Sequence, residues 1–214
     1  PKLNAHISFL REIYQLPTMH FTCIPYCRTS INSIIVSPIF RESRSSREKI
    51  RRQLCLSDGD LLVLVTMGGI PIDQHNGKIN LPAGNVKFLF PVNNINTKIG
   101  NENIIYLPHN HPYFHPDLVK ASDLVIGKLG YSTVAEVYSF AKPFLFIGRK
   151  NFPESRVLEQ YVREEMVSDE IEVNCIFSLQ SLEIIQNLIS KSNMKIPPIN
   201  GADQIASLIR NKLF

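Results

Sequence analysis

The sequence predicts an α/β fold built on a doubly wound parallel sheet, and two observations support this. Short apolar runs are continuous rather than alternating, which is typical of parallel strands covered on both faces. Helical stretches follow these runs in turn, and such alternation favours right-handed crossovers between parallel strands. No apolar run approaches the roughly 20 residues of a membrane-spanning helix. The predicted strands are 34–36, 61–66, 86–90, 104–107, 124–126 and 143–147, and the predicted helices are 46–56, 116–121, 133–140, 154–165, 179–190 and 202–212.

The first 30 residues have a different texture from the rest. They contain a possible helix over 3–16 and a short strand over 21–26, with several prolines around them. We expect residues 1–33 to be the tail of a preceding domain and its linker, and residues 34–214 to form the sheet domain. Because the chain does not begin with Met and its start resembles no signal peptide, we expect it to be a piece of something longer.

Composition places the chain among ordinary globular proteins. It has 214 residues, of which 44% are hydrophobic and 20% charged, and this excludes disordered, collagen-like and coiled-coil chains. The four cysteines form no disulfide framework, which favours a reduced, cytoplasmic chain. Cys23 and Cys27 are four positions apart, but no second ligand pair accompanies them. We expect no metal and no cofactor.

The formal net charge of +4 is concentrated in one segment. Residues 41–52 hold six basic and two acidic side chains, and the remainder of the chain balances. One interpretation is an anionic partner such as a phosphate. The other is a solvated helix face that begins with a Ser45-x-x-Glu48 capping box. No aromatic residue interleaves this segment and no recognition module is present, so nucleic acid is not an expected partner.

Two predicted strands end in glycine, and this edge is the expected ligand site. In open α/β sheets, ligands bind beyond the carboxyl ends of the strands. Strand 61–66 is followed by Gly68 and Gly69, whereas 124–126 is followed by Gly127, Gly130 and a helix. Glycine allows close backbone approach, and a helix N-terminus attracts phosphate. The pair predicts a diphosphate site, although each loop alone can be a tight turn, and neither is a dinucleotide fingerprint or a Walker A loop.

Two further features have alternative interpretations. Thr133-x-x-Glu136 at a helix start is a capping box, unless Glu136 turns outward and accepts hydrogen bonds from sugar hydroxyls. His109, His111 and His115 lie in a proline-rich loop after a predicted strand. A loop that lines a ligand crevice is favoured there over a three-histidine metal site.

Residues 117–136, followed by Ala141-Lys142-Pro143-Phe144, resemble the donor-binding half of GT-B glycosyltransferases. The shared pattern is A-x-D-L-x-I-x-x-x-G-x-x-T-x-x-E, then a helix and a small-x-Pro step into the next strand. The sequence is similar to the peptidoglycan N-acetylglucosaminyltransferases and to the glycosyltransferase-like half of plant L-arabinokinases. The resemblance covers about 34–214 and is specific at 117–155.

This resemblance implies a Rossmann-like domain that binds a nucleotide diphosphate-sugar, with a UDP-sugar as the expected donor. The acceptor and the base belong to the N-terminal domain of such enzymes, so the fragment alone is expected to transfer nothing. The last helix, 202–212, should cross back towards that domain. A non-catalytic binding or regulatory module and a UDP-sugar epimerase-like protein remain alternatives, and the N-terminal sequence would discriminate among them.

The resemblance also implies the roles of individual residues. Glu136 matches the residue that binds the ribose. The diphosphate should meet the N–H groups after Gly130 with Ser132 and Thr133, and also Arg41 and the glycine pair. The backbone of Leu107 and Pro108 should read the base, and the segment from Asn151 to Glu154 the donor sugar. The expected site therefore comprises Arg41, Gly68, Gly69, Leu107, Pro108, Lys128, Gly130, Ser132, Thr133, Glu136, Asn151 and Glu154.

Lys128 bears on stereochemistry. Retaining GT-B enzymes commonly carry an acidic residue there, with seven residues between it and the ribose-binding glutamate. Lysine cannot replace that carboxylate, but it suits a diphosphate leaving group. The alternative is a solvated loop lysine. We therefore expect the parent enzyme to invert the anomeric centre.

Overall fold

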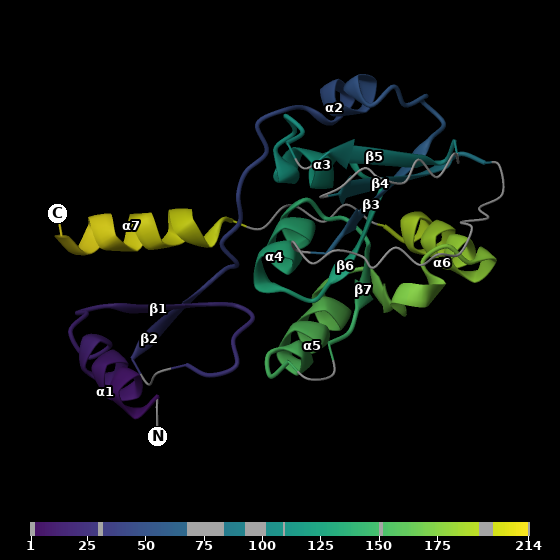
Figure 1. Cartoon of the computed structure of the whole chain (residues 1–214). Coiled ribbons are helices and arrows are strands. Elements are labelled where there is room, and N and C mark those ends of the chain that lie inside the picture. Colours follow the sequence, from purple (N-terminus) through teal and green to yellow (C-terminus); the bar gives the residue numbers. More distant parts are fainter. Residues whose placement is uncertain are drawn as a thin grey trace.

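The computed structural model describes residues 3–29, 32–67, 84–92, 102–108, 110–149, 152–192 and 199–213. They form a six-stranded parallel sheet flanked by helices, with a separate two-stranded sheet at one side (Figure 1). The strands are β1 (His20–Cys23), β2 (Ser33–Val36), β3 (Leu61–Thr66), β4 (Val86–Val92), β5 (Ile104–Pro108), β6 (Leu124–Lys128), β7 (Phe144–Ile147) and β8 (Ser168–Glu170). The α-helices are α1 (Asn4–Ile13), α2 (Arg47–Gln53), α3 (His115–Ala121), α4 (Tyr131–Ser139), α5 (Ser155–Glu165), α6 (Leu179–Ser190) and α7 (Gly201–Leu213), and a short 3-10 helix spans Val173–Cys175.

The large sheet has the strand order of a doubly wound Rossmann-like fold, as the sequence predicts. Its order is β5-β4-β3-β6-β7-β8, and every neighbouring pair is parallel. The direction of winding therefore reverses between β3 and β6. In such folds the crevice at this reversal, beyond the carboxyl ends of the strands, is the usual ligand site.

One predicted strand of the large sheet is wrong, and one strand was missed. Residues 34–36 do form a strand, but it belongs to β2, which pairs in parallel with β1 in the small sheet. The sixth strand is instead β8, which pairs with β7. Its Ser-Asp-Glu sequence has no apolar run, because an edge strand can present polar side chains to solvent. As expected, the described part of the first 30 residues, 3–29, stays outside the large sheet.

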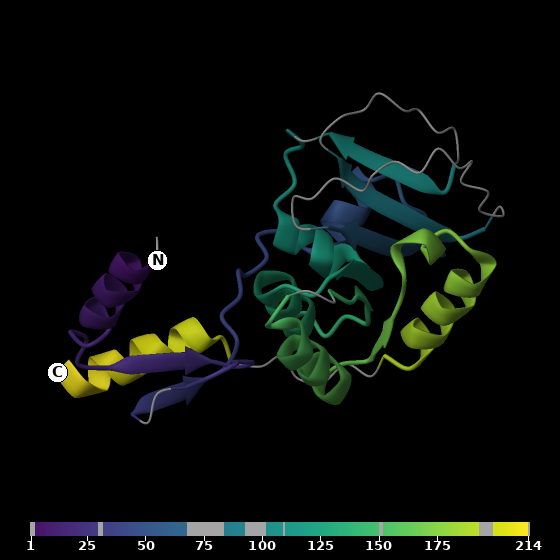
Figure 2. The same ribbon diagram turned by 60° about the horizontal axis from the view of Figure 1, so that its bottom comes forward.

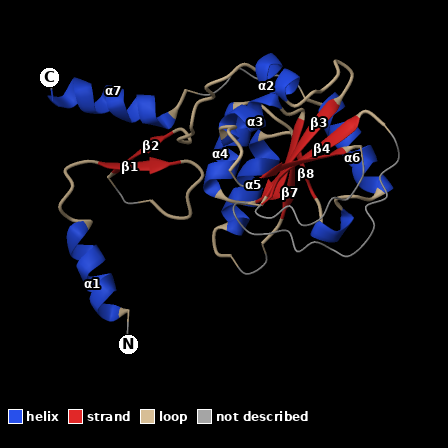
Figure 3. Ribbon diagram, turned by 45° about the horizontal axis from the view of Figure 1, so that its top comes forward, coloured by secondary structure: helices blue, strands red, loops and turns tan. Residues whose placement is uncertain are grey.

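The central strands are buried on both faces, which explains their continuous apolar sequences. Leu62, Val63 and Leu64 are successive residues of β3 and are fully buried. Leu62 and Leu64 pack with α2, α3, α4 and α5, whereas Val63 packs with α6 on the opposite face. Figure 3 shows the helices on either side of the strands.

The last helix lies beside the small sheet rather than the large one (Figure 2). Its start is bound to the linker that joins the two sheets. The Gly201 N–H donates to the Pro38 carbonyl over 3.1 Å, and the Asn200 amide donates to the Phe40 carbonyl over 2.9 Å. A side chain at Gly201 would collide with the Ser37 carbonyl. These contacts fix the linker on the N-terminal side of Arg41.

Two arginines of the basic segment serve the fold. Arg47 and Arg51 both pair with Asp123, at 2.5 Å and 3.1 Å, and both donate to the carbonyl of Ala121. The predicted cap is displaced by one residue, since Ser46 rather than Ser45 accepts from the Lys49 N–H. These two arginines therefore have intramolecular partners and cannot be counted towards an anion site.

Lys142 lies near this arginine pair, and its charge should reduce stability. Burial, and next the charge of Arg47, lower the pKa of Lys142 to about 8 from its ordinary 10.5. Between these two values the unfolded chain binds more protons than the folded chain, so this contribution to the free energy of unfolding rises with pH. We expect Lys142→Met to stabilise the protein at pH 7 by about 1–2 kcal/mol. Urea unfolding at pH 7 and pH 10 should show this advantage shrinking at high pH, and an equal advantage at both would contradict the explanation.

Gly127 allows β3 and β6 to pack closely at the reversal point. A Cβ atom there would lie 2.8 Å from the backbone oxygen of Thr66, whereas one at Gly130 would meet nothing within 4 Å. We expect Gly127→Ala to lower the free energy of unfolding by about 2 kcal/mol because the clash involves backbone. Denaturant unfolding of the matched Gly130→Ala variant should give nearly wild-type stability. Equal losses in the two variants would contradict this account.

Candidate functional site

Four side chains form a continuous chain of contacts at the carboxyl edge of the sheet, and we call them the Glu136 cluster. Thr66, the last residue of β3, places its Oγ1 3.2 Å from His115 Nε2. His115, the first residue of α3, places its Nδ1 2.9 Å from Glu136 Oε2. Arg41 Nε donates to Glu136 Oε1 over 2.7 Å. Both carboxylate oxygens of Glu136 therefore have a partner.

Glu136 is a buried, ionised carboxylate. Its side chain is 3% exposed, and burial alone would raise its pKa. The hydrogen bonds from His115 and Arg41 outweigh burial, so the pKa of Glu136 lies below its ordinary value. An ionised carboxylate only accepts, so His115 Nδ1 carries the proton and, in the neutral ring, Nε2 accepts from the Thr66 hydroxyl. In the Glu136 cluster, Arg41 and His115 therefore donate to one negative charge, and Thr66 donates to His115.

The capping-box interpretation of Thr133 and Glu136 is wrong. Helix α4 begins at Tyr131, its N-cap is Gly130, and Thr133 lies within the first turn. Glu136 turns to Arg41 and His115 instead of back along its own helix. The start of α4 consequently has no side-chain cap.

This uncapped start is the second part of the site. The Val134 N–H makes the first bond within the helix, to the Gly130 carbonyl over 2.9 Å. The N–H groups of the first turn, including those of Ser132 and Thr133, lie at the positive end of the helix dipole. Because a Cβ at Gly130 would meet open space, an anion can approach these groups closely.

Lys128 and Arg149 add positive charge beside the start of α4. Lys128 ends β6, and burial together with the charge of Arg149 lowers the pKa of Lys128. The Arg149 guanidinium lies 3.7 Å from the centre of the Phe152 ring. No acidic side chain pairs with either cation in the part of the chain that the structure describes. Arg149 was not among the residues expected from the sequence.

The linker is fixed on both sides of Arg41. Beyond it, the buried carboxylate of Asp117 accepts from the Arg44 N–H at 2.6 Å and the Ser45 N–H at 3.0 Å. The guanidinium of Arg41 lies 5.3 Å from the centre of the Phe114 ring and that of Arg44 4.0 Å. Arg41 nevertheless keeps 56% of its side chain exposed. Arg41 is therefore a partly exposed cation on a backbone that is fixed on both sides.

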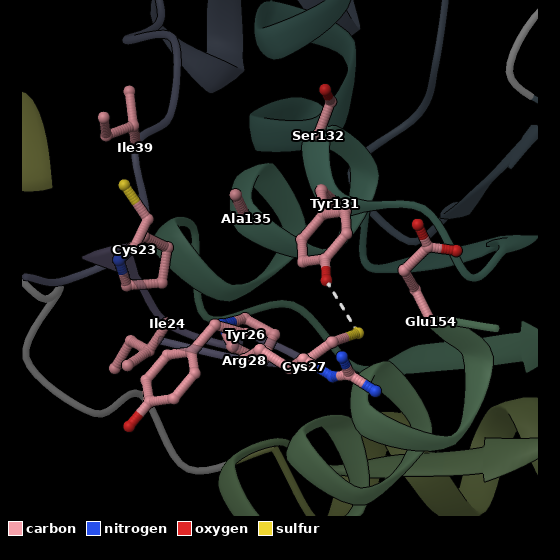
Figure 4. A pocket seen from close by; sticks show the side chains of 12 residues that line it. Cys23, Ile24, Tyr26, Cys27, Arg28, Ile39, Tyr131, Ser132, Ala135 and Glu154 are labelled. Carbon is pink, nitrogen blue, oxygen red and sulfur yellow. Dashed lines mark hydrogen bonds between the residues drawn. The ribbon is translucent and has the colours of Figure 1, made fainter. Parts of the chain in front are cut away.

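A cavity of about 610 Å³ adjoins the first turn of α4 (Figure 4). One wall is the segment 23–28, and others come from the linker, the first turn of α4 and Glu154. The Tyr131 hydroxyl points toward Cys27, with its oxygen 3.7 Å from the sulfur, and burial and this contact raise the pKa of Tyr131 to about 12. Ser132 and Glu154 both line the cavity.

The structure brings together only part of the expected site. Arg41 contacts Glu136 directly, and Lys128, Gly130, Ser132 and Thr133 surround the start of α4. Leu107 and Pro108 end β5, and the Leu107 side chain belongs to the hydrophobic core, so its backbone alone can face a ligand. Gly68, Gly69 and Asn151 lie outside the described residues. The roles of all these residues stay predictions.

The contacts of His115 with Thr66 and Glu136 were not predicted from the sequence. His115 was noted as one histidine of a loop, but nothing local indicates that its partners are Thr66 and Glu136. His111 Nδ1 accepts from the Tyr113 N–H over 3.2 Å, and His109 lies outside the described residues. Within the described ranges, no group of three His, Cys, Asp or Glu residues is placed to hold a metal ion. None of the helices in these ranges has the length and hydropathy of a membrane span.

Comparison with known proteins agrees with the fold. No protein-family model matches the chain. It is 25% identical over 182 residues to the L-arabinokinase of Arabidopsis thaliana, which is 83% of this chain but 17% of the plant protein. It superposes on MurG of Acinetobacter baumannii with a TM-score of 0.60 at 13% identity, over 94% of this chain and 62% of MurG. It also superposes on the spinosyn forosaminyltransferase SpnP with a TM-score of 0.50 at 13% identity, over 89% of this chain and 55% of SpnP.

These structures are glycosyltransferases of the GT-B class. The chain therefore has the fold of one Rossmann-like half of a GT-B glycosyltransferase. It spans less than two thirds of the length of each relative described above.

Proposed function

We propose that this chain is the donor-binding half of an inverting GT-B glycosyltransferase, and that its ligand is a nucleotide diphosphate-sugar, with UDP-sugar as the expected donor. In this proposal residues 1–33 are the tail of an N-terminal acceptor domain, with β2 and α7 packed beside it, and the large sheet within 34–214 holds the donor. The protein would act in the cytoplasm, a location that suits its four free cysteines. The acceptor is unassigned.

The observation that carries this proposal is the placement of Glu136 beside the uncapped start of α4 at the reversal of the sheet. A buried ionised carboxylate is a strong acceptor for the two hydroxyls of a ribose. The helix start and its neighbouring cations offer donors to a diphosphate. The distance along α4 from Gly130 to Glu136 is fewer than two turns, so one nucleotide can reach both.

The same arrangement supports inversion in the parent enzyme. The acceptor oxygen would attack the anomeric carbon on the face opposite the diphosphate and lose its proton to a base in the acceptor domain. The bond from that carbon to the diphosphate oxygen would break, and its electron pair would stay on the diphosphate. Lys128, the start of α4 and Arg41 would stabilise the growing negative charge. The sugar would extend toward the cavity lined by Ser132 and Glu154.

Saturation-transfer NMR of the chain with UDP, GDP, dTDP and several UDP-sugars tests this proposal. We expect a saturation-transfer signal for UDP and for at least one UDP-sugar. We expect no sugar to be transferred to added acceptors, because the catalytic base lies in the acceptor domain. Absence of signal for every nucleotide would reject donor binding. Sugar transfer by residues 1–214 alone would reject the proposal that the catalytic base lies in a separate acceptor domain. The anomeric coupling of the product made by a longer chain would decide between inversion and retention.

A second candidate is a nucleotide-sugar-binding module that transfers nothing in any context. The similarity to an L-arabinokinase favours it, because that relative is named for a kinase and not for a glycosyltransferase. Both candidates predict donor binding by this chain. They differ in a longer chain, where only the first predicts release of UDP in the presence of donor and acceptor.

A further inference from the structure

We infer that Arg41 is a latch on the nucleotide site: it occupies Glu136 when the site is empty and exchanges this carboxylate for the diphosphate when a donor binds. This inference rests on the proposed function and deepens it. It concerns the Arg41–Glu136 ion pair, which joins the linker to α4 across 95 positions of the sequence.

Glu136 cannot receive a ribose while both of its partners stay in place. Its side chain is 3% exposed, with Arg41 against one oxygen and His115 against the other, so neither oxygen is open to solvent. A hydroxyl pair that approaches from solvent therefore needs one of the two partners to leave. His115 and Arg41 differ in how easily each can do so.

His115 is the fixed partner. Its ring is held at both nitrogens, by Glu136 and by Thr66 at the end of the central strand β3, and 28% of its side chain is exposed. Arg41 is the exchangeable partner. It donates to Glu136 through Nε, it lies on the open side of the cluster, and 56% of its side chain is exposed.

Departure of Arg41 alone is unfavourable, because it leaves a buried carboxylate with one partner fewer. A nucleoside diphosphate removes this obstacle, since it carries both replacements. Its ribose hydroxyls donate to the vacated Glu136 oxygen, while its diphosphate accepts from the released guanidinium. Glu136 keeps two hydrogen-bonding partners in both states, and Arg41 keeps an anionic partner in both. A nucleoside without phosphates opens the latch but offers Arg41 nothing in return.

The latch predicts opposite effects of one substitution on two ligands. Arg41→Ala should weaken UDP binding by about 10-fold or more, because the diphosphate loses a charged donor. The same substitution should tighten uridine binding by about 3- to 10-fold, because Arg41 no longer competes for Glu136. Arg44→Ala is the matched control, since Arg44 shares the Phe114 ring but does not contact Glu136. It should leave uridine binding unchanged.

Calorimetric titration of the wild-type, Arg41→Ala and Arg44→Ala chains with UDP and with uridine tests this inference. A merely structural Arg41 would move both affinities in the same direction, and that result overturns the latch while leaving donor binding intact. Wild-type protein that binds neither ligand would instead reject the proposed function, and the latch with it. As a second readout, UDP should shift the Arg41 Nε–H resonance in nitrogen-15 spectra of the wild-type chain. An unshifted resonance at saturating UDP would also overturn the exchange.

Discussion

Glu136→Ala is expected to weaken UDP binding by about 10- to 150-fold, which corresponds to the loss of a charge-assisted hydrogen bond worth roughly 1.5–3 kcal/mol. The carboxylate is ionised and buried at the reversal of the sheet, and an ionised acceptor makes a stronger hydrogen bond to a ribose hydroxyl than a neutral one. The substitution also removes the counter-charge of Arg41 and a partner of His115.

Isothermal titration calorimetry of the wild-type and Glu136→Ala proteins with UDP measures this change in affinity directly. Thermal unfolding of each variant should accompany it, because loss of the ion pair can also lower stability. Lys191→Ala is the control: this lysine is exposed at the end of α6, away from the carboxyl edge of β3 and β6, and its loss should leave UDP affinity unchanged. Equal UDP affinity of the wild-type and Glu136→Ala proteins would reject the assignment of the ribose site.

Asp123→Ala is expected to give the largest loss of stability, about 3 kcal/mol, or a fall in Tm of about 6–12 °C for a chain of this size. One oxygen of Asp123 pairs with Arg47, and the other accepts from Arg51 and from the Leu62 N–H at 2.7 Å. Removing this carboxylate leaves two cations and a backbone N–H at the start of β3 without their acceptor.

Thermal and urea unfolding of the variant would check this expectation. Asp58→Ala offers a matched loss of one carboxylate at an exposed position and should change Tm by less than about 2 °C. A small effect of Asp123→Ala would show that the arginine pair is stabilised by its carbonyl partners rather than by the ion pairs.

The sequence was most informative where burial on both faces of the sheet dictates it. The continuous apolar runs of β3, β4, β5, β6 and β7 predicted parallel strands because helices cover both faces. Residues 179–190 were predicted as a helix with the bounds that α6 has. Apolar runs did not predict β8, because it is an edge strand without apolar residues. They predicted β2 as a strand but placed it in the wrong sheet, since β2 pairs with β1 in the small sheet.

The site was predictable only as far as its local geometry. Glycine after β6 and a following helix indicated an anion site, and α4 begins at Tyr131 with Gly130 as its N-cap, two residues before the predicted start. The choice between a capping box and an outward Glu136 could not be made from Thr133-x-x-Glu136, because both fit the same spacing. Arg41 and His115, which lie 95 and 21 positions away in sequence, rule out the capping box, whereas acceptance of sugar hydroxyls by Glu136 stays a prediction. Such partners are set by the topology of the chain and leave no local signal.

The central claim is that a nucleotide diphosphate binds at the start of α4, and backbone amide NMR of the nitrogen-15-labelled chain tests it most directly. Titration with UDP should shift the N–H signals of Tyr131, Ser132 and Thr133, because these groups would donate to the diphosphate. The amide signals of α6, on the opposite face of the sheet, should stay in place. Saturation with UDP that leaves the first turn of α4 unshifted, or that shifts α6 instead, would contradict the account.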